Sequence, residues 1–94
     1  MLKATWKGAV LAKSDAFETV EGNIYFPRQA LDWAHLTESL TRTTCPRKGV
    51  ANYFNVVVDG KMNADAAWYY PDPKPAARHI AGHVAFWRGV TVSK

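Results

Sequence analysis

An all-β fold is predicted by three features of this 94-residue sequence. Short runs of alternating apolar and polar residues follow one another along most of the chain, as they do in half-buried strands. Turn residues that include glycine separate these runs, and such short loops join antiparallel strands. Apolar residues take a helical spacing in only one segment, residues 31–40. We therefore predict a compact, mainly antiparallel β domain with one short helix.

The N-terminal part is expected to form two hairpins. Gly8 and Gly22 stand between the alternating runs, where a turn needs a residue that accepts a positive φ. Pro27 ends the second hairpin because it has no N–H to donate to a neighbouring strand. The predicted strand pairs are Lys3–Trp6 with Ala9–Lys13, and Phe17–Val20 with Ile24–Phe26.

The middle of the chain predicts a helix followed by strands. A short helix is expected from the spacing of the apolar residues Leu31, Trp33, Ala34, Leu36 and Leu40. Thr41–Thr44 is β-branched and predicts a short strand before Cys45-Pro46. Val50–Val58 is the strongest strand candidate, and Asp59-Gly60 after it is typical of a two-residue hairpin loop. Lys61–Tyr70 should therefore return antiparallel to it.

The C-terminal part begins with a stiff connector. The segment Pro71–Pro75 holds three prolines in five residues, which fix φ and remove N–H donors. Ala76–Ile80 is expected to form a helical turn. Gly82–Trp87 and Gly89–Val92 are predicted to be the last two strands.

Composition limits the class of protein. Residues 1–94 are expected to form a single domain, since 48% hydrophobic and 13% aromatic residues can build one core. A single cysteine excludes an intramolecular disulfide. No apolar stretch approaches the roughly 18 residues of a membrane span, and no signal-peptide pattern opens the chain. We expect no membrane partner and a cytoplasmic location.

The formal net charge is +4, and the basic residues are scattered along the chain. Lysines and arginines occur singly, and only Arg47-Lys48 forms a doublet. Nucleic-acid binders gather basic residues on one face or in one run, so a nucleic-acid partner is not expected. A metal site is not expected either, because the soft or imidazole donors are limited to Cys45, His35, His79 and His83, and a site with one cysteine and three histidines is an unusual structural zinc site.

The order of several short motifs resembles a known family. The central block is Thr43-x-Cys45-Pro46-x-Lys48-Gly49-x-Ala51-x-Tyr53, with Trp6-x-Gly8 and Tyr25-Phe26-Pro27 before it and Ala67-Trp68-x-Tyr70 after it. These residues are similar to those of a small bacterial and fungal family catalogued as a domain of unknown function, sometimes labelled nucleotidyltransferase. The resemblance implies a β-tent-like antiparallel fold and no settled activity. Arg47 departs from the family, where an aromatic residue is frequent; if it faces a pocket, this chain differs from its relatives in ligand preference.

The nucleotidyltransferase label conflicts with the distribution of acidic residues. Nucleotidyl transfer needs neighbouring carboxylates that hold Mg²⁺ and a glycine-rich loop for the phosphates. The eight acidic residues stand one at a time, and neither type of glycine-rich phosphate loop is present. We therefore do not expect this activity.

The Cys45 loop is the place where chemistry is expected. Cys45 is a candidate catalytic residue because Lys48 and Arg47 can lower the pKa of a nearby thiol and so favour the nucleophilic thiolate. A buried, inert thiol is the structural alternative. Lys48 is a candidate catalytic or ligand-binding residue, since it can also bind an anion beside Gly49.

Aromatic residues beside small ones predict a ligand pocket. Tyr53, Trp68 and Tyr70 should approach the Cys45 loop if Val50–Val58 pairs with Lys61–Tyr70, and Ser14 is a further candidate. The same residues also suit an ordinary core. Three hypotheses follow: a module that binds a small ligand, a small enzyme with Cys45 as nucleophile or redox thiol, and a protein or nucleic-acid interaction domain. No cofactor is expected.

Overall fold

The computed structural model describes residues 1–94 and confirms the all-β class. Its strands form three antiparallel sheets: a three-stranded sheet in the order β2-β1-β9, a two-stranded ribbon β3-β4 and a four-stranded sheet β5-β6-β7-β8. The strands are β1 (Leu2–Trp6), β2 (Ala9–Ser14), β3 (Glu18–Val20), β4 (Asn23–Tyr25), β5 (Leu36–Cys45), β6 (Gly49–Val58), β7 (Lys61–Tyr69), β8 (Val84–Phe86) and β9 (Thr91–Ser93). Three short 3₁₀ helices are η1 (Arg28–Ala30), η2 (Trp33–His35) and η3 (Pro75–Ile80).

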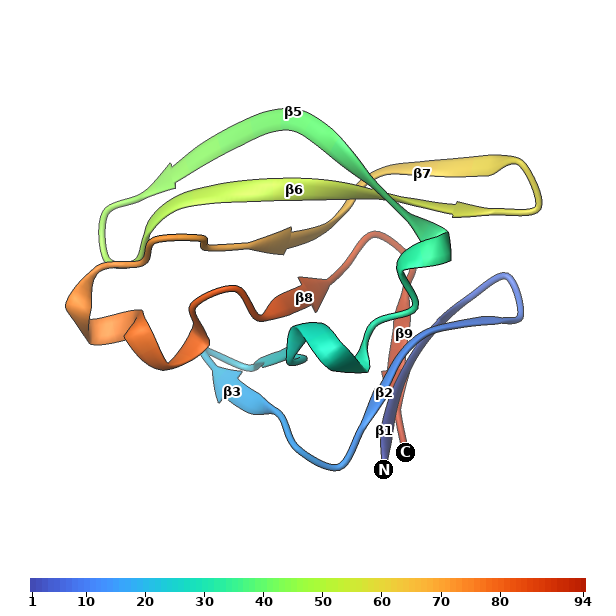
Figure 1. Ribbon diagram of the computed structural model, residues 1–94, viewed down its shortest axis with the longest axis horizontal. Coiled ribbons are helices and arrows are strands. Elements are labelled where there is room, and N and C mark those ends of the chain that lie inside the picture. Colours follow the sequence, from blue (N-terminus) through green and yellow to red (C-terminus); the bar gives the residue numbers. More distant parts are fainter.

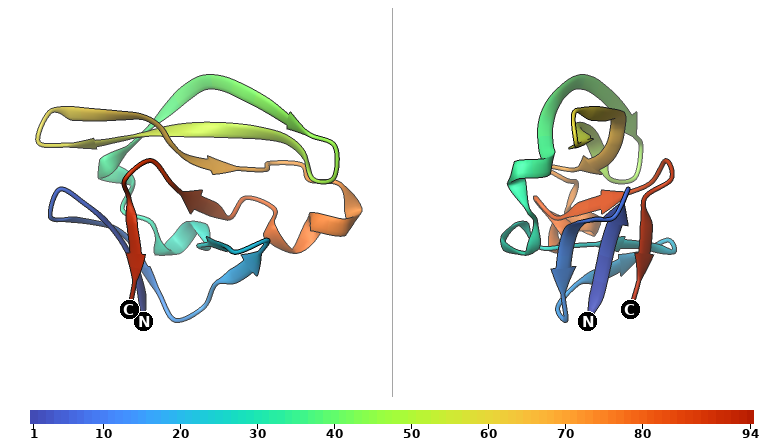
Figure 2. Two further views of the ribbon diagram at one scale, coloured as in Figure 1. Left: turned by 180° about the vertical axis from the view of Figure 1, so that it is seen from behind. Right: turned by 90° about the vertical axis from the view of Figure 1, so that its right-hand side faces the viewer.

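The three-stranded sheet stands crosswise to the four-stranded sheet. Figure 1 shows β5 and β6 running along the top of the molecule, while β1, β2 and β9 run steeply downward below one end. The view turned by 90° in Figure 2 shows β1, β2 and β9 side by side with the four-stranded sheet above them. Lys3 of β1 pairs with Ser93 of β9, so the two chain ends lie together.

Three hairpins have the two-residue turns expected of glycine-containing loops. Both central residues have positive φ in each turn, as a type I′ geometry requires. The pairs are Lys7-Gly8 (48° and 78°), Glu21-Gly22 (51° and 81°) and Asp59-Gly60 (50° and 74°). The predicted hairpins over residues 3–13, 17–26 and 50–70 are thereby confirmed.

The helix predicted over residues 31–40 is wrong. Only η2 is helical there, a single turn begun by Asp32, whose carboxylate accepts a bond of 3.1 Å from the Ala34 backbone N–H. From Leu36 onward the chain is strand β5, paired with β6. β-branched threonines favour this extended form, and Leu40 is 96% exposed, which no core-facing helical position would be.

β5 and β7 both bulge where they cross the middle of β6. Three residues of β5, Ser39 to Thr41, stand opposite Tyr53, between the pairs Glu38–Phe54 and Arg42–Asn52. β7 carries a similar insertion around Asp65, which has a φ of 56°. The Asp65 carboxylate joins the two bulges by accepting bonds from Ser39 Oγ (2.5 Å) and Thr41 Oγ1 (2.9 Å).

The bulge in β7 also sets which residues of β6 and β7 face each other. A regular hairpin continuing from Asp59-Gly60 would place Tyr53 opposite Ala66. With the bulge, Tyr53 pairs directly with Trp68, and Phe54 with Ala67. Two extra residues therefore bring two aromatic side chains to the same place on neighbouring strands.

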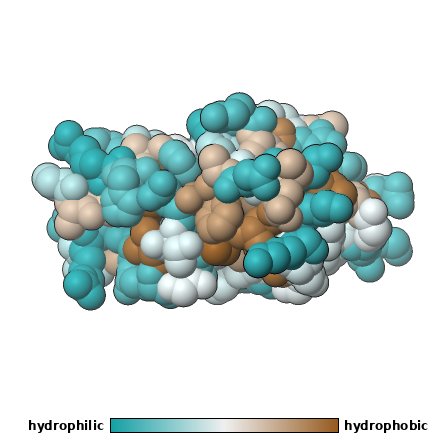
Figure 3. Space-filling model, turned by 90° about the horizontal axis from the view of Figure 1, so that it is seen from below, coloured by the Kyte–Doolittle hydropathy of each residue, from teal (hydrophilic) through white to brown (hydrophobic).

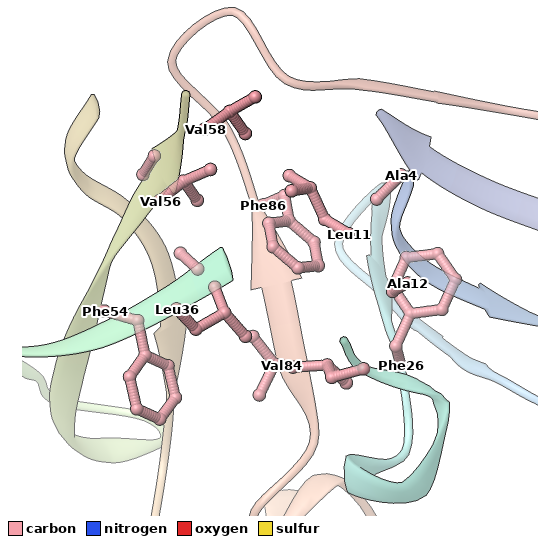
Figure 4. Packing of buried hydrophobic residues seen from close by; sticks show 13 residues of the cluster. Ala4, Leu11, Ala12, Phe26, Leu36, Phe54, Val56, Val58, Val84 and Phe86 are labelled. Carbon is pink, nitrogen blue, oxygen red and sulfur yellow. The ribbon is translucent and has the colours of Figure 1, made fainter. Parts of the chain in front are cut away.

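The larger hydrophobic cluster lies between the crossed sheets. Figure 4 shows Phe54, Val56 and Val58 of β6 on one side, Ala4, Leu11 and Ala12 of β1 and β2 on the other, and Phe86 of β8 between them. A smaller cluster consists of Tyr25, Ala51, Tyr70, Ala77, Ile80 and Ala85. β8 contributes Val84 and Phe86 to the larger cluster and Ala85 to the smaller one.

Apolar and hydrophilic side chains are unevenly distributed on one face of the surface (Figure 3). On the face seen from below, apolar atoms gather near the middle and hydrophilic side chains occupy both ends (Figure 3). No helix has the length and apolar character needed to cross a membrane.

The connector after β7 has no regular structure until η3 begins at Pro75. The helical turn predicted at 76–80 is confirmed, because these residues lie within η3.

Candidate functional site

The Cys45 loop is a tight connection between β5 and β6. Cys45 pairs with Gly49, which leaves Pro46, Arg47 and Lys48 as the loop. Lys74, from the proline-rich connector, braces it twice: its backbone N–H donates to Lys48 O and its Nζ donates to Pro46 O, both at 2.8 Å. These two hydrogen bonds hold the loop on the connector and fix the backbone of Lys48.

Gly49 supplies the backbone conformation with which the loop enters β6. Its φ of 116° lies in a region that L-residues rarely adopt, and a Cβ added there would lie 3.5 Å from Asp72 O. Glycine is therefore required by the backbone conformation, since a Cβ would meet the connector only at an ordinary contact distance. This gives a structural reason for glycine directly after Lys48.

A cleft of about 470 Å³ opens beside this loop. Four of the residues expected to bind a ligand meet there: Lys48, Tyr53, Trp68 and Tyr70. The other lining residues are Glu21, Asn23, Tyr25 and Trp87. The volume lies within the range of about 300–1,000 Å³ found for small-molecule sites.

Aromatic rings form the walls of this aromatic cleft. Trp68 meets Tyr25 edge to face, with ring centroids 6.1 Å apart and planes at 88°, and meets Trp87 at 5.6 Å and 75°. The Trp68 indole N–H donates to the Tyr25 hydroxyl at 3.2 Å. Tyr53, opposite Trp68, shares a hydrogen bond of 2.9 Å with the Thr43 hydroxyl. These contacts fix the orientation of Trp68 and Tyr53.

The aromatic residues divide between core and cleft. Tyr25 and Tyr70 are buried and pack in the smaller cluster, so they form the floor. Tyr53 and Trp68 are half-buried, and Trp87 is 43% exposed. The buried Tyr25 and Tyr70 are therefore core residues, whereas the partly exposed Tyr53, Trp68 and Trp87 form the walls of the cleft.

One ion pair closes an end of the cleft. Lys48 Nζ donates to the Glu21 carboxylate, which projects from the β3–β4 turn. The Lys48 side chain is 13% exposed, whereas that of Glu21 is 54% exposed. The only acidic residue of the cleft is thus paired with its only basic residue.

Cys45 is not on the lining of the cleft and is half-buried against the smaller cluster. The backbone amides of Arg47 and then Lys48 lower the pKa of its thiol, because they favour the thiolate. Partial burial opposes this effect, and the Tyr70 hydroxyl and the Arg47 charge add to it. Burial, followed by the nearby charges of Tyr25 and Cys45, raises the pKa of Tyr70 to about 12.

Other candidates from the sequence lie elsewhere. Ser14 ends β2 and exchanges hydrogen bonds with the backbone of Ala16, outside the cleft. His35 bonds to Val57 O at 3.0 Å and His83 to Ala81 O at 3.2 Å. No three His, Cys, Asp or Glu side chains gather where they could hold a metal ion.

Sequence reasoning missed half of the lining. Glu21, Asn23 and Tyr25 come from the β3–β4 ribbon, which reaches the cleft through the bridge between Phe26 and Val84. Trp87 is placed by its indole N–H, which donates to Asp65 O in the β7 bulge. A local pattern carries no signal for either contact, since both join segments far apart in the chain.

No curated protein matches the chain. The family model NTP_transf_9, described as a domain of unknown function (DUF427), matches residues 1–93. This match covers nearly the whole sequence, and the chain belongs to the DUF427 family.

Proposed function

We propose that the protein binds a small cyclic ligand that carries an anionic group. Tyr53 and Trp68 contact the ring of the ligand, and Lys48 pairs with its anionic group. The observation that carries this proposal is the direct pairing of two half-buried aromatic residues over a cleft with a lysine at its end. Aromatic walls with a few polar groups are typical of small-molecule sites.

The proposal is tested by a thermal-shift screen against metabolites and nucleotides. A ligand that binds only the folded state raises the melting temperature. We expect the ligand-induced shift to disappear in Trp68→Ala and Lys48→Ala, each compared with its own ligand-free melting temperature. Trp33→Ala and Lys61→Ala change the same residue types outside the cleft and should keep the shift. The absence of any hit, or hits that persist in Trp68→Ala, would contradict the proposal.

The lowered pKa of Cys45 supports a second candidate, a small enzyme with Cys45 as nucleophile or redox thiol. A nucleophile also needs a base, and no histidine is among the groups that affect the Cys45 thiol, which are Arg47, Lys48 and Tyr70. We therefore rank ligand binding first.

Nucleotidyl transfer fits the residues poorly. The reaction requires carboxylates that together hold Mg²⁺. Glu21 is the one carboxylate of the cleft, and it is paired with Lys48. The cleft therefore offers no pair of carboxylates that could share a magnesium ion.

A further inference from the structure

A second cavity adjoins the aromatic cleft. It has a volume of about 160 Å³ and is lined by Val20, Glu21, Arg47, Lys48, Ala76 and Ala77. Glu21 and Lys48 line both cavities. The ion pair therefore stands at the boundary between an aromatic space and a smaller one that contains Arg47.

The two partners of this ion pair are held very differently. Lys48 is mostly buried, and its loop is braced by the proline-rich connector. Glu21 sits at the tip of a ribbon with three residues in each strand, and its carboxylate has no hydrogen bond other than the one from Lys48. The ribbon itself is anchored by Tyr25 in the smaller cluster, but the Glu21 side chain is 54% exposed and can rotate into solvent. Lys48 is the fixed charge, and Glu21 is the charge that can turn away.

Removing the Glu21 carboxylate would leave two cations and no acid around the joined cavities. Glu21 is the only acidic residue in either lining, and Arg47 and Lys48 are the only basic ones. A mostly buried lysine needs a counter-charge. An anion that arrives from the cleft can supply it, while Glu21 regains full solvation at the ribbon tip.

We propose that Glu21 occupies the position of the ligand's anionic group and competes with it for Lys48. This inference rests on the proposed function and names the ligand class: a ring that lies in the aromatic cleft, joined to a carboxylate or phosphate that reaches Lys48 and Arg47. A ligand of this class displaces the Glu21 carboxylate and extends into the second cavity. A neutral ring occupies the aromatic cleft alone and leaves the ion pair in place.

The test compares Glu21→Gln with Glu18→Gln, which removes the same charge from the same ribbon but lies on neither lining. Benzoate and benzamide are titrated against tryptophan fluorescence, because they share a ring and differ in charge. Inorganic phosphate is titrated separately against the backbone amide signals of Arg47 and Lys48. We expect Glu21→Gln to bind benzoate and phosphate about two- to fivefold more tightly, as the loss of a partly exposed ion-pair competitor allows. Benzamide affinity should not change.

Two further variants locate the effect. Arg47→Gln in the Glu21→Gln background should remove part of the gain for phosphate, because the second cation is lost. Trp68→Ala should abolish binding of both benzoate and benzamide and leave phosphate binding unchanged. A melting curve for each variant establishes that it is folded under the titration conditions.

The outcomes separate the two proposals. If Glu21→Gln and Glu18→Gln bind benzoate and phosphate alike, Glu21 does not compete with an anion and the inference is overturned, even where Trp68-dependent ring binding supports the proposed function. If neither ring depends on Trp68, the proposed function fails. A gain for phosphate in Glu21→Gln alone would in that case still support the anion position at Lys48.

Discussion

The Cys45 thiol and the Tyr70 hydroxyl influence each other's protonation. Tyr70 keeps its proton because burial raises its pKa to about 12. It can therefore donate a hydrogen bond to the Cys45 thiolate across the pH range in which the thiol ionises. The backbone amides of Arg47 and Lys48 act in the same direction and lower the pKa of Cys45. The thiolate is favoured mainly by backbone groups, which side-chain substitutions leave in place.

The lowered pKa of Cys45 predicts early alkylation. The rate of modification by iodoacetamide should rise with pH around a midpoint lower than that of the urea-unfolded protein, because the thiolate is the reactive form. Tyr70→Phe should move this midpoint upward, since one donor to the thiolate is lost. The measurement is the alkylation rate from pH 5 to pH 10, followed by mass spectrometry.

Tyr69→Phe is the matched control for this experiment. Tyr69 stacks on Phe54 at 4.7 Å and does not contribute to the pKa of Cys45. Its midpoint should equal that of the unchanged protein. A midpoint as high in the folded protein as in urea would contradict the prediction and remove the support for the enzyme candidate.

At this scale, residue type and strand alternation are enough to bring some site residues together. Lys48 lies in the loop before β6, and Tyr53, Trp68 and Tyr70 lie along β6, β7 and the residue after β7, so local pairing brings them near one another. The bulge in β7, which the sequence did not reveal, places Tyr53 directly opposite Trp68. Glu21 could not be found in this way. Its turn identifies it only as a surface residue, and its partner lies 27 positions along the chain.

Among the elements, the paired bulges of β5 and β7 determine the shape of the four-stranded sheet. Asp65 holds them together through Ser39 and Thr41, and its backbone N–H donates to the Asn55 side chain at 3.1 Å. Trp87 also bonds to this bulge through Asp65 O. The bulge therefore supports one wall of the aromatic cleft.

Asp65→Asn should destabilise the protein. The hydrogen bond from Ser39 lowers the pKa of Asp65 more than any other contact, with Thr41 and Arg88 adding to it and burial opposing it. Hydrogen bonds to a charged group contribute on the order of 1–3 kcal/mol. Urea unfolding at pH 7 should show a loss of this size.

The pH dependence gives a second test. Because the folded-state pKa of Asp65 lies below the unfolded one, its contribution is present above the unfolded pKa of about 4 and is lost as pH falls through the folded pKa. The difference between Asp65→Asn and the unchanged protein should therefore shrink in acid. Asp72→Asn, at an exposed position, should show neither effect. A constant difference at every pH would contradict the assigned cause.

Element types were predictable where turn residues marked the boundaries, as at Asp59-Gly60. The segment from Leu31 to Leu40 shows the limit of such reasoning. Its apolar spacing fits a helix, yet a free edge of β6 was available, and pairing there satisfies the backbone of Leu36–Cys45. A tertiary partner overrode the local pattern. The bulges of β5 and β7 could not be predicted either, because two inserted residues do not change the apolar–polar alternation of a short strand.

For the whole molecule, β8 connects the two hydrophobic clusters. Alternate residues of this short strand enter different clusters, and all three are buried. Loss of one cluster should therefore expose part of the other. We expect residues 1–94 to unfold as one cooperative unit, in keeping with the prediction of a single domain.

Ile80→Ala tests this cooperativity. Ile80 is fully buried in the smaller cluster, and such truncations cost about 2–5 kcal/mol. Near-ultraviolet circular dichroism reports aromatic packing and far-ultraviolet dichroism reports the strands. Both urea midpoints should fall together. Met62→Ala, at a side chain 59% exposed, should leave them unchanged. Two separate transitions in Ile80→Ala would contradict the prediction.

The pairing of Lys3 with Ser93 places the two ends of the described chain on neighbouring strands, about 5 Å apart across the sheet. A few glycines could therefore join the ends without disturbing either strand. New ends opened at Asp59-Gly60 would leave the aromatic cleft intact, because that turn lies far along the hairpin from Tyr53 and Trp68. The order of elements along the chain can thus be circularly permuted while the same sheets form.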